Sequence, residues 1–96
     1  MKIVLEFCNG PFAGRRIALR SSVRLTVGRT SRADIEVVSD DDLSAVHFEL
    51  QVEPEGVFLR DLHSQYGTFV NDRPVKMAPL NDGDSVQAGQ SLFRII

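Results

Sequence analysis

The stretch HFELQV (residues 47–52) alternates apolar and polar side chains, with Phe48, Leu50 and Val52 in the apolar positions. Such period-two alternation is typical of a β-strand that buries one face. The stretch KIVLEF near the N-terminus (residues 2–7) offers Ile, Leu and Phe at alternate positions in the same way. No ten-residue window shows a convincing run of apolar residues at helical spacing. The sequence therefore predicts an all-β chain.

Further short strands are predicted between turn sequences rich in Gly, Pro, Asn and Asp. They cover Arg15 to Arg20, Arg24 to Gly28, Ile35 to Val37, Val57 to Leu62, Asp84 to Ala88 and Leu92 to Ile96. Many short strands, with no helices to carry parallel crossovers, favour a mainly antiparallel β-sandwich. In such a fold the loops at one end are the candidate functional surface.

The length and composition are typical of one soluble globular domain: 96 residues, of which 43% are hydrophobic and 25% charged. We expect a single domain over residues 1–96, either whole or excised from a longer multidomain protein. A chain of this size leaves little room for a large enclosed substrate cavity, so recognition is expected at the surface.

The charge and the cysteine content exclude several classes of protein. The net charge of −2 argues against nucleic-acid and anionic-membrane binding. No segment is apolar enough to span a bilayer or to serve as a signal peptide, so a cytoplasmic location is expected. The single cysteine, Cys8, excludes an intramolecular disulfide, and its spacing to His47 and His63 is not that of a zinc site. We expect no metal and no cofactor.

Three segments carry recognisable motifs: VGRTSRADI (27–35), DDLSAVHFEL (41–50) and LRDLHSQYGTFVND (59–72). Their key residues are Gly28 and Arg29, then Ser44 and His47, then Ser64, Gly67, Thr68 and Asn71. In this order and at these intervals they resemble the forkhead-associated (FHA) domain family. The resemblance extends over nearly the whole chain, including the terminal LNDGDSVQAGQSLFRI. It implies recognition of phosphothreonine in partner proteins by loops at one end of a sandwich.

The resemblance assigns the phosphate contacts to Arg29 and Ser44. A planar guanidinium can bond two phosphate oxygens at once, and phosphothreonine carries about −1.5 to −2 charges at neutral pH. Ser44 matches the phosphate-binding serine of the family, whose hydroxyl and nearby backbone amides complete the cradle. Gly28 is expected to adopt a backbone conformation closed to residues that have a side chain.

Two substitutions depart from the family pattern. Ala45 stands where the family often has Arg, so it offers only its backbone amide to a phosphate, and Arg32 is the candidate for a compensating charge. Tyr66 replaces an asparagine whose amide holds the main chain of the bound peptide. Gln65 and Tyr66, which precede Gly67, complete the predicted phosphopeptide-binding set.

The other motif residues are expected to be structural. The resemblance gives His47 the role of holding the recognition loop, and Ser64 belongs to the same structural motif. Gly67 is expected in a tight turn, and the Thr68 hydroxyl is expected to bond neighbouring backbone. Asn71 and its successor Asp72 are predicted to form a hairpin turn.

The acidic run before Ser44 is predicted to divide its roles. Asp41 matches an acid that the family often has three residues before the serine, so we expect it to be structural. Asp40 and Asp42 are hypothesised to select basic residues that flank the phosphosite, a hypothesis motivated by charge alone.

The leading hypothesis is a non-enzymatic, phosphothreonine-dependent protein-protein interaction module acting in Ser/Thr kinase signalling or regulated assembly. The alternative is an FHA-scaffold interaction domain that binds a partner independently of phosphate, with Tyr66 as an apolar anchor. A third hypothesis, a small hydrolase built on Ser44 and His47, lacks the third orienting group that such catalysis requires. No sequence feature specifies an oligomeric state.

Overall fold

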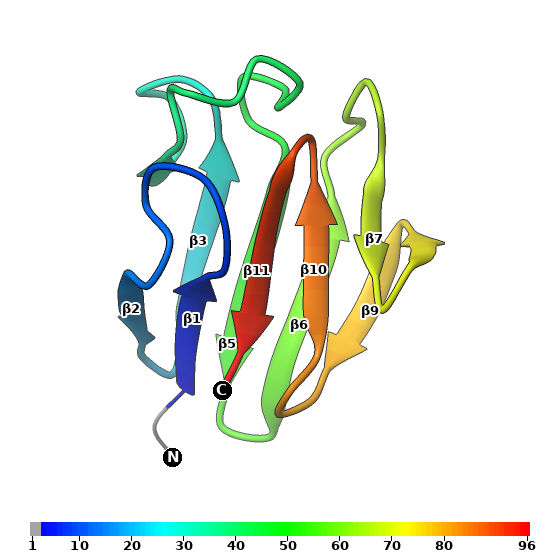
Figure 1. Ribbon diagram of the computed structural model, residues 1–96. Helices are drawn as coiled ribbons and strands as arrows, with labels where there is room; N and C mark the ends of the chain where they lie inside the picture. Colours follow the sequence, from blue (N-terminus) through cyan, green and yellow to red (C-terminus); the bar gives the residue numbers. More distant parts are fainter. Residues whose placement is uncertain (1–2) are drawn as a thin grey trace.

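Two packed sheets form the structure of residues 3–96, which the computed structural model describes (Figure 1). The six-stranded sheet has the order β2 (Arg16–Leu19), β1 (Ile3–Phe7), β11 (Ser91–Ile95), β10 (Ser85–Ala88), β7 (Thr68–Val70) and β8 (Arg73–Val75). The five-stranded sheet has the order β4 (Ile35–Glu36), β3 (Val23–Gly28), β5 (Phe48–Glu53), β6 (Gly56–Asp61) and β9 (Met77–Leu80). The β3–β4 pair is parallel, and the other pairs are antiparallel. The predicted mainly antiparallel β-sandwich is confirmed.

The alternating apolar residues of the central strands meet in the core between the sheets. Phe48 and Leu50 of β5 are fully buried, as is Phe93 of β11 in the opposite sheet. The Phe93 ring contacts Phe7 of β1 and Phe48 edge to face, with ring centroids 5.0 and 5.8 Å apart. Because Phe48 lies in one sheet and the other two rings in the second, these aromatic contacts join the two layers.

Each predicted strand is present, with ends displaced by at most one residue, but three strands were not predicted. The missed strands are β7, β8 and β9, which are only three or four residues long. Pro74 in β8 and Pro79 in β9 also argue against a strand, because proline cannot donate to a ladder hydrogen bond. Both prolines are tolerated because β8 and β9 are edge strands.

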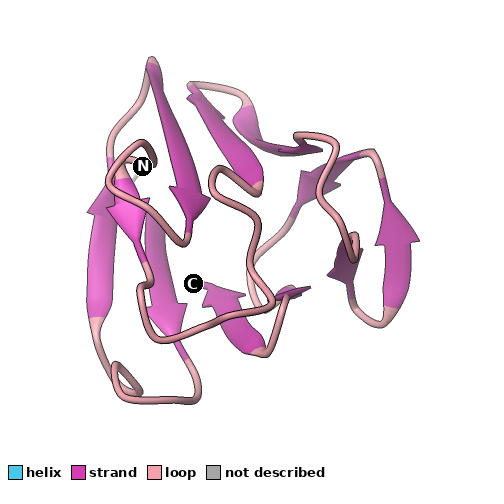
Figure 2. Cartoon of the chain, turned by 90° about the horizontal axis from the view of Figure 1, so that it is seen from above, coloured by secondary structure: helices cyan, strands magenta, loops and turns pink. Residues whose placement is uncertain are grey.

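Several loops gather at one end of the sandwich, and the start of β1 and the C-terminus lie at the other (Figure 1; from above in Figure 2). The gathered loops connect β3 to β4, β4 to β5, and β6 to β7, and the β10–β11 turn lies beside them. The loops at this end of the sandwich are therefore brought together, as the sequence predicts.

No helix long and apolar enough to cross a membrane occurs in the described part of the chain.

A two-residue turn joins β7 to β8. Asn71 and Asp72 both have positive φ, 49° and 69°, which suits the turn type that matches the twist of a hairpin. The Asn71 amide also donates to the Asp84 carboxylate (2.9 Å) and accepts from the Ser85 backbone (3.0 Å). This turn therefore fixes the edge of the six-stranded sheet to the start of β10.

We expect Asn71→Ala to lower the free energy of unfolding by about 2 kcal/mol, because it removes two side-chain hydrogen bonds and places alanine at positive φ. Asp72→Gly is the matched control in the same turn, since glycine adopts positive φ without strain. Urea denaturation of the three proteins measures the difference. A destabilisation by Asp72→Gly as large as that by Asn71→Ala would contradict this account of the turn.

Candidate functional site

Arg29 directly follows β3, and its side chain is exposed at the loop end. Its backbone N–H donates to the Ser44 carbonyl (3.0 Å), and its Nε donates to the Leu43 carbonyl (3.1 Å). These two bonds hold the β3–β4 loop against the β4–β5 loop. Within residues 3–96 neither terminal guanidinium nitrogen donates a hydrogen bond, so both stay available to a ligand. No sequence motif indicated the Leu43 carbonyl as the hydrogen-bond partner of this side chain.

Gly28 is required by a close approach of the main chain and not by its φ. A Cβ at this position would collide with the Ala45 carbonyl and would lie 2.8 Å from the Val46 Cα. Its φ lies outside the positive region that favours glycine. The expectation of a special backbone conformation is therefore wrong: glycine lets the β4–β5 loop pack directly onto the end of β3.

Ser44 presents its hydroxyl beside the Arg29 loop. The Ser44 Oγ accepts a hydrogen bond from the Gln65 backbone N–H (3.0 Å), which leaves the hydroxyl proton available to a second acceptor. Because Arg29 is bonded to the Ser44 carbonyl, the two candidate donors belong to directly connected loops. Together they offer donors to an anion at the surface of the domain.

His47 is fully buried, and its ring bonds the β4–β5 loop and the β6–β7 loop. Its Nδ1 accepts from the Ser44 backbone N–H (3.0 Å), so its Nε2 carries the proton and donates to the Gly67 carbonyl (2.8 Å). Both ring nitrogens are thus used by main-chain groups. Nucleophilic catalysis needs the base to bond the hydroxyl, but here the Ser44 Oγ is bonded to Gln65. This geometry does not support the hydrolase hypothesis.

The carboxylate of Asp61, at the end of β6, organises the β6–β7 loop. It accepts hydrogen bonds from the Ser64 hydroxyl, from the Ser64 backbone (3.2 Å) and from the Thr68 hydroxyl (2.7 Å). The Ser64 Oγ in turn accepts from the Gly67 backbone (3.0 Å), and Gly67 has a φ of 86°. The Thr68 hydroxyl was expected to bond backbone, so its bond to Asp61 corrects that detail. Sequence reasoning did not single out Asp61.

Two opposing effects act on the pKa of Asp61. Partial burial raises the pKa, and the hydrogen bonds from Ser64 and Thr68 lower it. The hydrogen bonds prevail, so the pKa lies below its ordinary value of 3.8. The ionised carboxylate is therefore the form that holds the loop.

Asp40 is a buried anchor of the β4–β5 loop, only 5% exposed. Its carboxylate accepts hydrogen bonds from the Ser91 hydroxyl (2.6 Å), the Gln90 backbone (2.9 Å) and the Asp42 backbone (3.0 Å). The hypothesis that Asp40 selects flanking residues of a ligand is therefore wrong. Asp41, expected to be the structural acid, is exposed. Asp42 is partly buried and accepts from the Gln90 side chain (2.8 Å).

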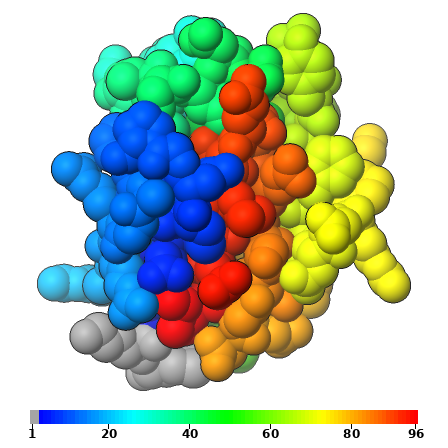
Figure 3. Space-filling model, viewed as in Figure 1, coloured from blue at the N-terminus to red at the C-terminus, as the bar shows by residue number. Residues whose placement is uncertain are grey.

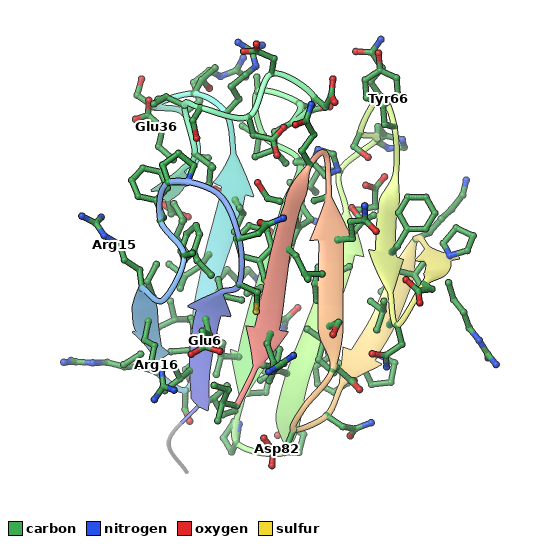
Figure 4. The ribbon with its side chains drawn as sticks, viewed as in Figure 1. Glu6, Arg15, Arg16, Glu36, Tyr66 and Asp82 are labelled. Atoms are coloured by element: carbon green, nitrogen blue, oxygen red, sulfur yellow. The ribbon has the colours of Figure 1, made fainter. Side chains whose placement is uncertain are left out.

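The remaining predicted site residues lie at the same end but differ in their contacts. The Ala45 carbonyl accepts from the Thr30 backbone (3.3 Å) and hydroxyl (3.0 Å), a contact that no motif residue indicated. Arg32 is exposed in the β3–β4 loop, and no hydrogen bond within residues 3–96 ties its guanidinium to Arg29 or Ser44. Tyr66 is 58% exposed and projects from the tip of the β6–β7 loop (Figure 4).

Comparison with known proteins agrees with this two-sheet recognition scaffold. The sequence model described as FHA domain matches residues 25–89. The chain belongs to the FHA domain family, as its motifs indicated. This is a family of non-enzymatic interaction domains.

A curated relative and two solved structures show the extent of the similarity. The glycogen accumulation regulator GarA of Mycobacterium tuberculosis is 37% identical over 87 residues, which cover 91% of this chain and 51% of GarA. The FHA domain of the CT664 protein from Chlamydia trachomatis superposes with a TM-score of 0.93 at 26% identity, covering 100% and 97% of the two chains. A structure from a structural and functional analysis of phosphothreonine-dependent FHA domain interactions gives 0.89 at 30% identity, covering 99% and 95%. The chain spans about half the length of GarA.

We expect Asp40→Ala to destabilise the domain by about 3 kcal/mol, because it leaves the buried Ser91 hydroxyl and the Gln90 backbone N–H without their acceptor. The exposed neighbour provides the matched control: Asp41→Ala should change the free energy of unfolding by less than about 0.5 kcal/mol. Chemical denaturation of both variants tests the assignment. Equal effects of the two substitutions would show that Asp40 does not anchor the loop.

We expect the Asp61 carboxylate to contribute about 2 kcal/mol at neutral pH. Because its folded pKa lies below 3.8, this contribution is complete above that pH and disappears as the pH falls through the lower, folded value. The difference in unfolding free energy between the unmodified protein and Asp61→Asn should therefore narrow between pH 5 and pH 2. Urea titrations at several pH values measure it, and a difference that stays constant over this range would refute the assignment.

Proposed function

We propose that this domain binds a phosphothreonine-containing segment of a partner protein, as a non-enzymatic interaction module in Ser/Thr kinase signalling or regulated assembly. Phosphothreonine is the product of such a kinase, so binding would couple kinase activity to the assembly of proteins. The cytoplasm is the proposed location, where a lone thiol such as Cys8 stays reduced. Residues 1–96 are proposed to act as one domain, because both sheets share one core.

One observation carries the proposal: Arg29 and Ser44 hold free donors on two loops that are bonded to each other. The Arg29 Nε is engaged by Leu43, which directs the terminal nitrogens outward, and the Ser44 hydroxyl keeps its proton for a ligand. A phosphate dianion can accept from both groups, and such charge-assisted bonds are among the strong hydrogen bonds of proteins. A structure described for phosphothreonine-dependent FHA interactions has the same fold at 30% identity, which further supports the assignment.

A second candidate function rests on Tyr66. This ring is 58% exposed beside the proposed phosphate site, where it can supply apolar contact area to a partner surface. In that case the scaffold would bind a partner independently of phosphate, and Arg29 would contribute little.

We expect a phosphothreonine peptide to bind and its unphosphorylated twin not to bind. Arg29→Ala should weaken the phosphopeptide about thirtyfold, which corresponds to about 2 kcal/mol for a charge-assisted pair. Binding should also weaken at high salt and as the pH falls through about 6, where the phosphate loses its second charge. Isothermal titration with a phosphothreonine peptide library measures these effects.

The matched control is Arg20→Ala, an exposed arginine directly after β2 and outside the loop cluster, which should leave the affinity unchanged. Affinity that survives Arg29→Ala would refute the phosphate clamp. Loss of partner binding in Tyr66→Ala, together with full binding in Arg29→Ala, would favour the phosphate-independent function.

A further inference from the structure

A groove of about 720 Å³ lies on the side of the sandwich next to the β6–β7 loop. Its walls include Ser64 and Gly67 of that loop and the corner at Lys76, where the chain leaves β8 and enters β9. β8 and β9 are edge strands of the two sheets, so the groove lies along an open side of the fold. In Figure 1 and in Figure 3 this side carries the yellow-green and yellow segments.

The groove combines basic side chains with an apolar wall. Lys76 and His63 are exposed, and the Arg60 side chain is half exposed (51%). Met77, which is 73% exposed, and Pro74 supply apolar surface. A ligand here would therefore meet positive charge and aliphatic surface together.

The charges that face the groove favour an anionic ligand. Arg60 contacts Glu49 at 3.5 Å, whereas Lys76 has no ion-pair partner within residues 3–96. Asp61 is the acid in the lining, and its carboxylate is already occupied by the hydroxyls of Ser64 and Thr68. Basic side chains therefore outnumber acidic ones in the lining of the groove.

The groove is built rigidly and is connected to the proposed phosphate site. The Asp61 backbone N–H donates to the Lys76 carbonyl (2.8 Å), while the Asp61 side chain holds Ser64 in the β6–β7 loop. The same loop bonds Ser44 through the Gln65 backbone. A chain bound at Ser44 therefore has only this short loop to cross before it reaches Lys76.

We infer that the groove binds an acidic segment of the same phosphorylated partner, several residues away from the phosphothreonine. The inference rests on the proposed function, since the phosphothreonine would anchor the partner at Arg29 and Ser44. Aspartate or glutamate side chains would face Lys76, His63 and Arg60, and an apolar side chain would contact Met77. Tethering by the phosphate would let weak surface ion pairs add measurable affinity.

The test compares peptides that share one phosphothreonine core. The core is extended on its N-terminal or its C-terminal side by about eight residues rich in glutamate, serine or lysine. This length sets the reach of the extension, because each residue of an extended chain spans about 3.3 Å. On one side the glutamate extension should bind about fivefold more tightly than the serine extension, a gain typical of one or two exposed ion pairs. The lysine extension should bind no better than serine. Fluorescence anisotropy at low salt measures these affinities.

Lys76→Gln should remove the gain from glutamate and leave the affinity of the unextended core unchanged. Arg20→Gln, on the β2 side of the fold, is the matched control and should keep the gain. Backbone amide NMR shifts should move at residues 75–77 and at His63 only with the glutamate extension. These three readouts separate the groove from a general charge effect.

The possible failures are distinguishable. If the unextended core binds only when phosphorylated, but glutamate gives no gain on either side or the gain survives Lys76→Gln, the groove inference is wrong and the proposed function stands. If the core does not bind, or binds equally without phosphate, the proposed function and the inference both fall.

Discussion

The buried ring of His47 connects the segments on which the candidate site depends. Its Nδ1 fixes the main chain at Ser44, and its Nε2 fixes the main chain at Gly67, in two loops separated by β5 and β6. The His47 backbone also bonds Val27 of β3 and Leu62 after β6. The His47 ring, together with the bond from the Gln65 backbone to Ser44, therefore holds the loop that carries Ser44 against the loop that carries Tyr66.

Two carboxylates extend this arrangement on either side of His47. Asp40 ties the β4–β5 loop to the β10–β11 turn, and Asp61 closes the β6–β7 loop on itself. Gly89 makes the first contact possible, because a Cβ there would lie 2.8 Å from the Asp40 carboxylate. Within residues 3–96 no buried side-chain polar atom lacks a hydrogen-bond partner. The donors that remain free, at Arg29 and Ser44, are thus confined to the surface, where a ligand can reach them.

The sequence predicted the sandwich because alternation such as that of HFELQV reports directly on which face of a strand is buried. It missed β8 and β9 because edge strands need little apolar patterning and tolerate proline. The motifs likewise identified Arg29, Ser44 and His47 as candidates, since the order and spacing of motif residues can be read from the sequence without a structure. They could not show that Asp40 and not Asp41 turns inward, because adjacent acids have the same charge and only the path of the loop decides which is buried. The sequence also could not show why position 28 requires glycine. The main chain that Gly28 approaches, at Ala45, is distant in sequence, so only the folded structure reveals the contact.

These placements explain how a chain with net charge −2 can offer a site to an anion. Charges separated by more than a Debye length, about 8 Å at physiological ionic strength, contribute little, so the local direction of each acid matters more than their number. The Asp40 carboxylate faces the amides and hydroxyl of the β10–β11 turn, and that of Asp61 faces the hydroxyls of its own loop. Two acids close to the site, Asp40 and Asp61, thus belong to its framework, where they hold the loops. The Arg29 guanidinium, whose Nε donates to a neutral carbonyl instead of to a carboxylate, keeps its charge directed at solvent.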